Sequence, residues 1–242
     1  MIIVGCARDV EKYWANTEKT LEHIFSCVPN YTCIIVESNS SDNTLDLIKK
    51  WCSLDSRREV ISLGNLEGTR TERLARSRNE YMERIKYLKD PYTLILDLDA
   101  AVELQPDFKS QLESCLQTPG WDAVSSNRTS IYWDTWALRC KALDIDYDCW
   151  EMITKAPPSY VMTSRGLRKV NPIQKYIFAK DRIIPPGPWI PVESAFGSLT
   201  LYKTDAIRKR RYSGETCEHI SFNRGLKMFI DPGFISGGSY KE

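Results

Sequence analysis

The sequence has 242 residues, of which 42% are hydrophobic and 27% are charged. These proportions are ordinary for a folded globular protein, so they exclude a disordered chain, a collagen-like chain and a small disulfide scaffold. Lys and Arg number 33 against 32 Asp and Glu, which gives a formal net charge of +1. A dedicated nucleic-acid binder shows a clear basic excess, so we expect no nucleic-acid partner.

The sequence contains no uninterrupted apolar run of about 18 residues, so we expect no transmembrane segment. Residues 1–9 meet charge at Arg8 and read as a strand entering a loop, not as a signal peptide. Eight scattered cysteines without a C-x-x-C pair indicate reduced, mostly buried thiols. We therefore expect a cytoplasmic location. The alternative is the Golgi lumen, if an N-terminal anchor has been removed.

The first hundred residues alternate between short apolar runs and helical patterns. We expect strands at residues 2–6, 33–36, 59–63 and 92–96. We expect helices at residues 13–28, 44–51 and 70–88, the second with Ser41 or Asp42 as its N-cap. This alternation predicts an α/β fold with a mostly parallel central sheet and flanking crossover helices.

The periodicity weakens after residue 100. We expect helices at residues 107–116 and 218–226, and strands at residues 123–126 and 196–202. Residues 133–189 are rich in aromatic, proline and charged side chains, with little periodicity, which is typical of functional loops. We expect a single domain over residues 1–242. Its nucleotide-binding half is residues 1–102, and an irregular substrate-shaping half follows at residues 103–242.

The triplet Asp97-Leu98-Asp99 follows the fourth expected strand. Side chains two residues apart on an extended backbone point to the same face, so both carboxylates meet beyond the strand end, where open α/β sheets bind ligands. Paired carboxylates repel each other unless a cation lies beside them. Oxygen ligands suit Mg²⁺ or Mn²⁺, which also bind diphosphates. Asp97 and Asp99 are therefore the predicted metal ligands.

With this triplet at the fourth strand, the chain resembles the GT-A glycosyltransferases, which have a Rossmann-like fold and use nucleotide sugars. Residues 37–44 (ESNSSDNT) resemble the acidic, Ser-rich loop that receives the nucleoside. Residues 74–79 (LARSRN) resemble the A-x-x-R-N helix segment under the donor, and residues 217–219 (CEH) the late acidic motif beside the acceptor. The pattern is most similar to the branch that contains fungal capsule-associated mannosyltransferases and related enzymes of large viruses. For a viral enzyme, the expected location is the host cytoplasm.

The resemblance implies transfer of a sugar from a UDP- or GDP-sugar to a hydroxyl of a glycan or glycoprotein acceptor, with Mn²⁺ or Mg²⁺ as cofactor. A stripe of four side chains recurs at three-residue spacing on the third expected helix: Arg70, Arg73, Arg76 and Asn79. Among them we favour Arg73 or Arg76 for contact with the diphosphate. Glu37 would accept hydrogen bonds from the ribose, with a loop role as the alternative. The predicted donor-binding residues are Arg8, Glu37, Ser38, Asn39, Arg73, Arg76, Asn79 and Asp97.

The late motif supplies the expected catalytic groups. His219 would complete the metal site through an imidazole nitrogen, and Glu218 would deprotonate the acceptor hydroxyl. The motif that it resembles normally ends in a carboxylate, where this chain has His219, so Glu193 is a rival for the base. A retaining mechanism would need no base at all.

Two other activities stay open at this point. A phosphatase would use Asp97 as nucleophile and Asp99 as acid, but such enzymes carry the motif on their first strand and need a later acidic pair. A nucleotidyltransferase could share the front half. It should then have a Gly-rich phosphate loop near the first strand, where Gly5 stands alone.

Overall fold

The computed structural model of the chain describes residues 1–98, 102–129, 132, 134–158, 160–163, 166–169 and 184–237. The strands are β1 (Ile2–Ala7), β2 (Thr32–Glu37), β3 (Arg58–Ser62), β4 (Tyr92–Leu96), β5 (Glu103–Leu104), β6 (Ala123–Asn127), β7 (Tyr160–Thr163), β8 (Gly166–Lys169), β9 (Ile190–Val192), β10 (Leu199–Lys203) and β11 (Met228–Gly237). The helices are α1 (Trp14–Cys27), α2 (Thr44–Cys52), α3 (Arg70–Ile85), α4 (Phe108–Gln117), α5 (Cys149–Lys155), α6 (Thr204–Ile207) and α7 (Glu218–Asn223). Two 3₁₀ turns, η1 (Glu11–Tyr13) and η2 (Lys141–Leu143), complete the set.

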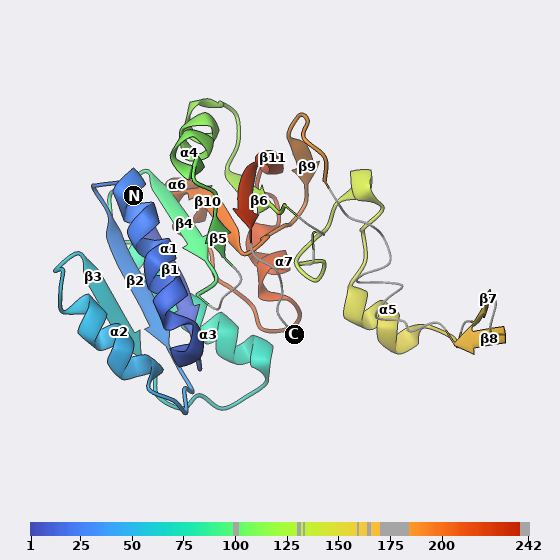
Figure 1. Cartoon of the computed structure of the whole chain (residues 1–242), viewed down its shortest axis with the longest axis horizontal. Helices are drawn as coiled ribbons and strands as arrows, with labels where there is room; N and C mark the ends of the chain where they lie inside the picture. The colour runs from blue at the N-terminus through green and yellow to red at the C-terminus, as the bar shows by residue number, and fades with distance from the viewer. Residues whose placement is uncertain are drawn as a thin grey trace.

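One sheet runs through both halves of the chain, with the strand order β3-β2-β1-β4-β10-β6-β11-β5 and β9 paired to β11 (Figure 1). Strands β1 to β4 run parallel to one another, which confirms the expected α/β front half. The back half is mixed, because β10 runs antiparallel to both β4 and β6. The carboxyl ends of β1, β2 and β4 therefore lie along one edge.

Helices cover both faces of this sheet, as the alternation of buried residues along the strands requires. On one face, α1, α2 and α4 pack through Leu21, Ile48 and Phe108 against strand residues that include Ile3. On the other face, α3, α6 and α7 pack against residues that include Ile2. Each core draws on residues from both halves of the chain, so neither half has a core of its own.

Local sequence explains where several elements begin and end. Helix α3 starts with a capping box, in which Thr69 accepts from the backbone of Glu72 and the Glu72 side chain accepts from Thr69 N–H. Strand β10 starts at Leu199, three residues later than expected, because Gly197 and Ser198 have positive φ values of 60° and 70° and form a turn. Helix α7 ends at Asn223, earlier than expected.

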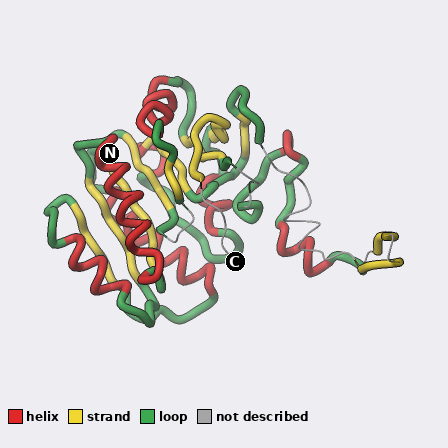
Figure 2. The backbone as a smooth tube through the Cα atoms, viewed as in Figure 1, coloured by secondary structure: helices red, strands yellow, loops and turns green. Residues whose placement is uncertain are grey.

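The back half contains elements that the sequence did not predict. Strand β11 is continuous over ten residues. The sequence does not predict it, because Pro and Gly are typical of turns and uncommon inside strands. Within the stretch expected to be irregular, α5 is capped by the side chain of Asp148, and β7 and β8 form an antiparallel hairpin. Figure 2 shows this hairpin beyond α5, away from the central sheet. The helix α2 has Asn43, not Ser41 or Asp42, at its N-cap position.

All eight cysteines lie within the described residues and are free thiols, five of them buried. In the part of the chain that the structure describes, no helix is both long enough and apolar enough to cross a membrane. The cytoplasmic location and the single-domain boundary stay predictions.

Candidate functional site

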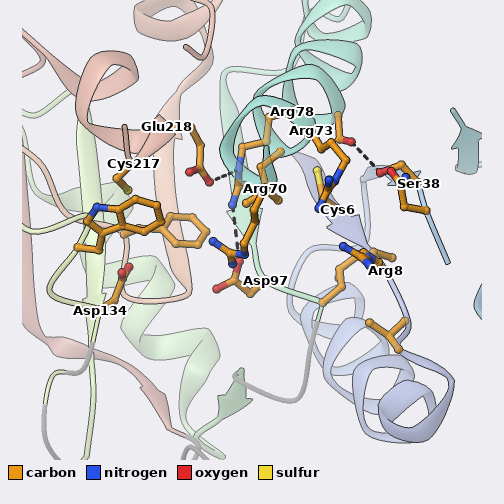
Figure 3. Close-up of a pocket in the computed structure, with 18 of the residues that line it drawn as sticks. Cys6, Arg8, Ser38, Arg70, Arg73, Arg78, Asp97, Asp134, Cys217 and Glu218 are labelled. Carbon is orange, nitrogen blue, oxygen red and sulfur yellow. Dashed lines mark hydrogen bonds and ion pairs between the residues drawn. The ribbon is translucent and has the colours of Figure 1, made fainter. Parts of the chain in front are cut away.

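A cavity of about 900 Å³ opens at the carboxyl ends of β1, β2 and β4 and is closed on its far side by segments of the back half. Figure 3 shows its arrangement: Arg8, Ser38 and Arg73 lie on one side, Cys217, Glu218 and Asp134 on the other. Asp97 and Arg78 lie between the two groups. The cavity therefore has a basic wall, an acidic wall, and a carboxylate where they meet.

Helix α3 supplies most of the basic wall. Its cavity-lining residues are Arg70, Arg73, Leu74, Ser77 and Arg78. This spacing of three and four residues keeps side chains on one face of a 3.6-residue helix, whereas a strict spacing of three drifts by about 60° per step. The predicted stripe therefore leaves the cavity after Arg73.

The drift explains where Arg76 and Asn79 lie. Arg76 is exposed and donates to the carbonyl oxygen of Glu67 at 3.3 Å. Asn79 exchanges two hydrogen bonds with the backbone of Tyr212, at 3.0 and 2.8 Å, and so ties α3 to the segment before α7. Neither residue lines the cavity.

The loop after β2 supplies the rest of the basic side. Ser38 lines the cavity and shares a hydrogen bond with Ser77 of α3 at 3.1 Å. Asn39 also lines it; its amide nitrogen donates to Leu66 O at 2.9 Å, while its buried Oδ1 has no hydrogen-bond partner among the described residues. A buried acceptor of this kind is satisfied when a ligand or a water molecule donates to it.

Glu37 has a different position from the other residues of this loop. It does not line the main cavity but a smaller one of about 260 Å³ beside it, which shares Asn39. Its two carboxylate oxygens accept hydrogen bonds from Ser40 N–H at 3.1 Å and from the Ser62 hydroxyl at 2.7 Å. This arrangement matches the loop role that the sequence left open.

Asp97 stands at the meeting point of the two walls, directly after β4 and Leu96. Its backbone N–H donates to Ser198 O at 2.9 Å, which fixes the end of the strand. Gly5 of β1 lies so close that a Cβ there would come within 2.7 Å of Leu98 Cγ and 2.8 Å of Leu96 O. Thr17 of α1 donates to Leu98 O at 2.9 Å. Three elements therefore hold the start of the D-x-D segment in place.

The predicted metal site is described only in part. A carboxylate at this strand end is the oxygen donor that Mn²⁺ or Mg²⁺ prefers, so Asp97 fits such an ion. Asp99 lies outside the described residues. Among the residues that are described, no three His, Cys, Asp or Glu side chains form a group able to hold a metal.

Arg78, which the sequence analysis did not single out, links the two acidic motifs. Its Nε donates to Glu218 Oε1 at 3.0 Å, and its Nη2 lies 3.7 Å from Asp97 Oδ1 (Figure 3). Arg78 and Glu218 are both only 4% exposed. The guanidinium also lies over the Phe196 ring at 5.2 Å. Arg78 is the Arg of the A-x-x-R-N segment, which is its signal in the sequence.

His219 and Glu193 do not line the cavity. The ring of His219 is buried and stacks on Phe196, with ring centroids 3.9 Å apart, and within the described part of the chain neither ring nitrogen has a hydrogen-bond partner. Burial, with the charge of Arg78 adding to it, holds the pKa of His219 well below its ordinary value, so the ring is neutral. Glu193 is exposed and pairs with Lys141 at 3.1 Å.

These two positions bear on the predicted roles. His219 would have to leave its stacking partner to reach a metal beside Asp97. Glu193 is exposed and is not among the residues that line the cavity. Glu218 is the member of the late motif that reaches the cavity.

Asp134 is a further acidic residue of the cavity that the sequence analysis missed. It follows β6 and lines the cavity beside Trp136 and Trp150. Its Oδ2 accepts from Gly197 N–H at 3.1 Å. Burial raises the pKa of Asp134 to about 6, and the nearby charge of Glu218 acts in the same direction. No motif marks Asp134 in the sequence; only its place between two tryptophans hinted at a site.

The comparisons with known proteins agree with this geometry. The profile of the family described as Glycosyl transferase family 2 matches residues 3–169. No protein of curated function matches the sequence. Among solved structures, the chain is similar to a mannosyltransferase, PcManGT from Pyrobaculum calidifontis, in complex with GDP-Man and Mn²⁺. The TM-score is 0.56 and the identity 11%, over 100% of this chain and 57% of that one.

Two other solved structures are similar at the same level. One is S. aureus TarS in complex with UDP-GlcNAc, with a TM-score of 0.53 and 12% identity over 100% of this chain and 59% of that one. The other is GalNAc-T7 with UDP, GalNAc and Mn²⁺, with a TM-score of 0.54 and 11% identity over 99% and 44%. The chain thus spans less than two thirds of each of these proteins. At identities this low, the structural similarity shows a shared fold alone, which is the GT-A fold.

Proposed function

The chain belongs to glycosyl transferase family 2, and on that premise we propose that it transfers a sugar from a nucleotide diphosphate sugar to a hydroxyl of a glycan or glycoprotein. One observation carries the proposal: a single cavity combines a basic wall, Asp97 at the end of β4, and an acidic, aromatic wall. The negatively charged diphosphate of a donor is complementary to the basic wall, and its neutral sugar can lie towards the acidic, aromatic wall.

The donor would lie along the basic wall. Arg8, Arg70 and Arg73 present three cations to a diphosphate, and Arg–phosphate contacts are among the strongest hydrogen-bonded ion pairs. The free Oδ1 of Asn39 is an acceptor for an N–H of the base. Asp97, with Asp99, would hold Mn²⁺ or Mg²⁺, which supplies charge neutralisation for the departing diphosphate. The solved structures named above contain GDP-Man or UDP with a sugar, so both nucleotides are candidates.

The acceptor would lie against the opposite wall. Trp136 and Trp150 line it, and Trp150 is 44% exposed. Aromatic faces pack well against the C–H side of a sugar ring, and the carboxylates beside them can orient hydroxyl groups. The composition of this wall is the observation that supports a carbohydrate as the acceptor.

The test is thermal unfolding of the protein with a panel of UDP- and GDP-sugars, with and without MnCl₂. A ligand at about 100 times its Kd stabilises by about 2.7 kcal/mol, which raises the Tm of a protein of this size by roughly 5–10 °C. We expect one nucleotide sugar to do so in the presence of Mn²⁺ only, and Asp97→Asn to lose the effect. The matched control is Asp205→Asn, an exposed carboxylate on α6.

The same assay separates the alternatives. If no nucleotide sugar shifts the Tm under either condition, the proposed function is wrong. Release of inorganic phosphate from a sugar phosphate would favour the phosphatase instead. Formation of pyrophosphate from a nucleoside triphosphate and a sugar phosphate would favour the nucleotidyltransferase.

A further inference from the structure

The acidic wall of the cavity holds two carboxylates, Asp134 and Glu218, and their surroundings differ. Both point into the same part of the cavity in Figure 3. Glu218 is paired with a cation: its Oε1 accepts from Arg78 at 3.0 Å, and the residue is only 4% exposed. Its carboxylate is therefore held as the partner of a buried guanidinium.

The carboxylate of Asp134 is oriented by a backbone hydrogen bond, and no described cation forms an ion pair with it within 4 Å. The donor of this hydrogen bond is the backbone N–H of Gly197, at 3.1 Å. Gly197 has a φ of 60°, and a Cβ there would lie 2.5 Å from Ser126 O. The turn that orients Asp134 therefore requires glycine at this position.

The same turn connects Asp134 to the end of β4, which Asp97 directly follows. Gly197 donates to Asp134, and the next residue, Ser198, accepts from the backbone N–H of Asp97. Two consecutive residues thus set the position of Asp134 relative to the end of β4. Since the donor's leaving group would be bound beside Asp97, this turn places Asp134 within the reacting part of the cavity.

Resting on the proposed function, we propose that Asp134 is the general base of an inverting transfer. The acceptor hydroxyl gives its proton to the Asp134 carboxylate while its oxygen forms the new bond to the anomeric carbon. The bond between that carbon and the diphosphate oxygen breaks, and the nucleoside diphosphate leaves with the electron pair. Trp136 and Trp150, on the same wall, lie where the acceptor sugar would pack.

The electrostatics of the site support this role. Burial raises the pKa of Asp134 to about 6, with the charge of Glu218 adding to the rise, whereas the backbone donors and the charge of Arg78 oppose it. The other titratable groups near its charge are Tyr132, Cys149 and Cys217, and burial raises the pKa of each, so all three are neutral. A base whose pKa lies just below the working pH is ionised, yet still accepts a proton readily.

The experiment compares wild type, Asp134→Asn, Asp134→Glu and the exposed control Asp205→Asn. The donor is the nucleotide sugar that stabilises wild type, the acceptor is the p-nitrophenyl glycoside with the fastest turnover, and MnCl₂ is present throughout. For Asp134→Asn we expect kcat to fall at least about a hundredfold, with an unchanged Kd for UDP or GDP with Mn²⁺. The wild-type rate should fall on the acid side of about pH 6. Asp134→Asn should lose this pH dependence, and Asp134→Glu should recover part of kcat.

Three results would overturn the inference while leaving the proposed function intact. The first is an Asp134→Asn variant that keeps kcat within about threefold of wild type. The second is loss of nucleotide binding in that variant, because Asp134 would then serve the donor or the fold. The third is retention of the donor's anomeric configuration in the product. If wild type neither binds nor turns over any nucleotide sugar, the proposed function itself fails, and the inference fails with it.

Discussion

Replacing Arg78 with Met should destabilise the protein strongly, because it leaves a buried carboxylate without its partner. Arg78 lies 4% exposed between Glu218, at 3.0 Å, and Asp97, at 3.7 Å. Removing one member of a buried ion pair costs about 3–5 kcal/mol. The longer contact to the more exposed Asp97 adds less than about 1 kcal/mol. The sum is about 3–6 kcal/mol, which for a chain of this size corresponds to a fall in Tm of roughly 6–24 °C.

The assay is urea unfolding followed by tryptophan fluorescence, with wild type and Arg78→Met compared at the same pH. The double variant Arg78→Met/Glu218→Gln removes the stranded charge and should recover most of the lost stability. Arg76→Met, on the exposed side of the same helix, should stay within about 0.5 kcal/mol of wild type. The reasoning would be refuted if Arg78→Met cost less than about 1 kcal/mol, or if the double variant were no more stable than the single one.

Two further predictions concern the same cavity. The pKa of Asp134, raised to about 6 from 3.8, means that the folded state binds the proton more tightly than the unfolded state does. The ionised carboxylate therefore lowers the free energy of unfolding by up to about 3 kcal/mol above about pH 6. This cost shrinks as the pH falls and is absent below about pH 4, where the carboxyl is protonated in both states. Thermal melts of Asp134→Asn should thus exceed wild type at pH 7.5 and match it near pH 4; equal Tm values at both pH values would contradict this. Gly5→Ala should cost about 1–3 kcal/mol by forcing Leu98 and the end of β4 aside. It should also weaken Mn²⁺-dependent nucleotide binding in calorimetry, and wild-type affinity in that variant would show that the strand end does not need the close approach.

Much of the front half follows from the sequence, because each element there is a local pattern. The run 92–96 is mostly apolar, as a strand buried on both faces requires, and the structure has β4 at Tyr92–Leu96. Strand β11 shows the opposite case: its Pro232 and Gly233 argue against a strand, and its pairing with β6, β9 and β5 makes it one. Such pairing between distant residues leaves no periodic signal.

The candidate site divides in the same way. Arg8, Ser38, Asn39, Arg73, Asp97 and Glu218 follow strand ends or motifs, and they all line the cavity. Arg76 was chosen by a three-residue spacing that does not match the helical repeat. Arg78 and Asp134 depend on partners 140 and 63 positions away along the chain, Glu218 and Gly197. The A-x-x-R-N segment is the local signal for Arg78, and no local motif marks Asp134.

The antiparallel strand at the centre of the sheet bears on how the chain folds during synthesis. Strand β4 is complete at Leu96, but its open edge is covered only by β10, which begins at Leu199. A ribosome that adds about 5–20 residues per second needs several seconds or more to make the chain between them. Throughout that time, the strand that carries Asp97 has one unpaired, apolar edge, which is the kind of surface that chaperones bind and that aggregates nucleate on. We therefore expect β4 to be the last part of the parallel sheet to become protected, even though it is made in the first half of synthesis.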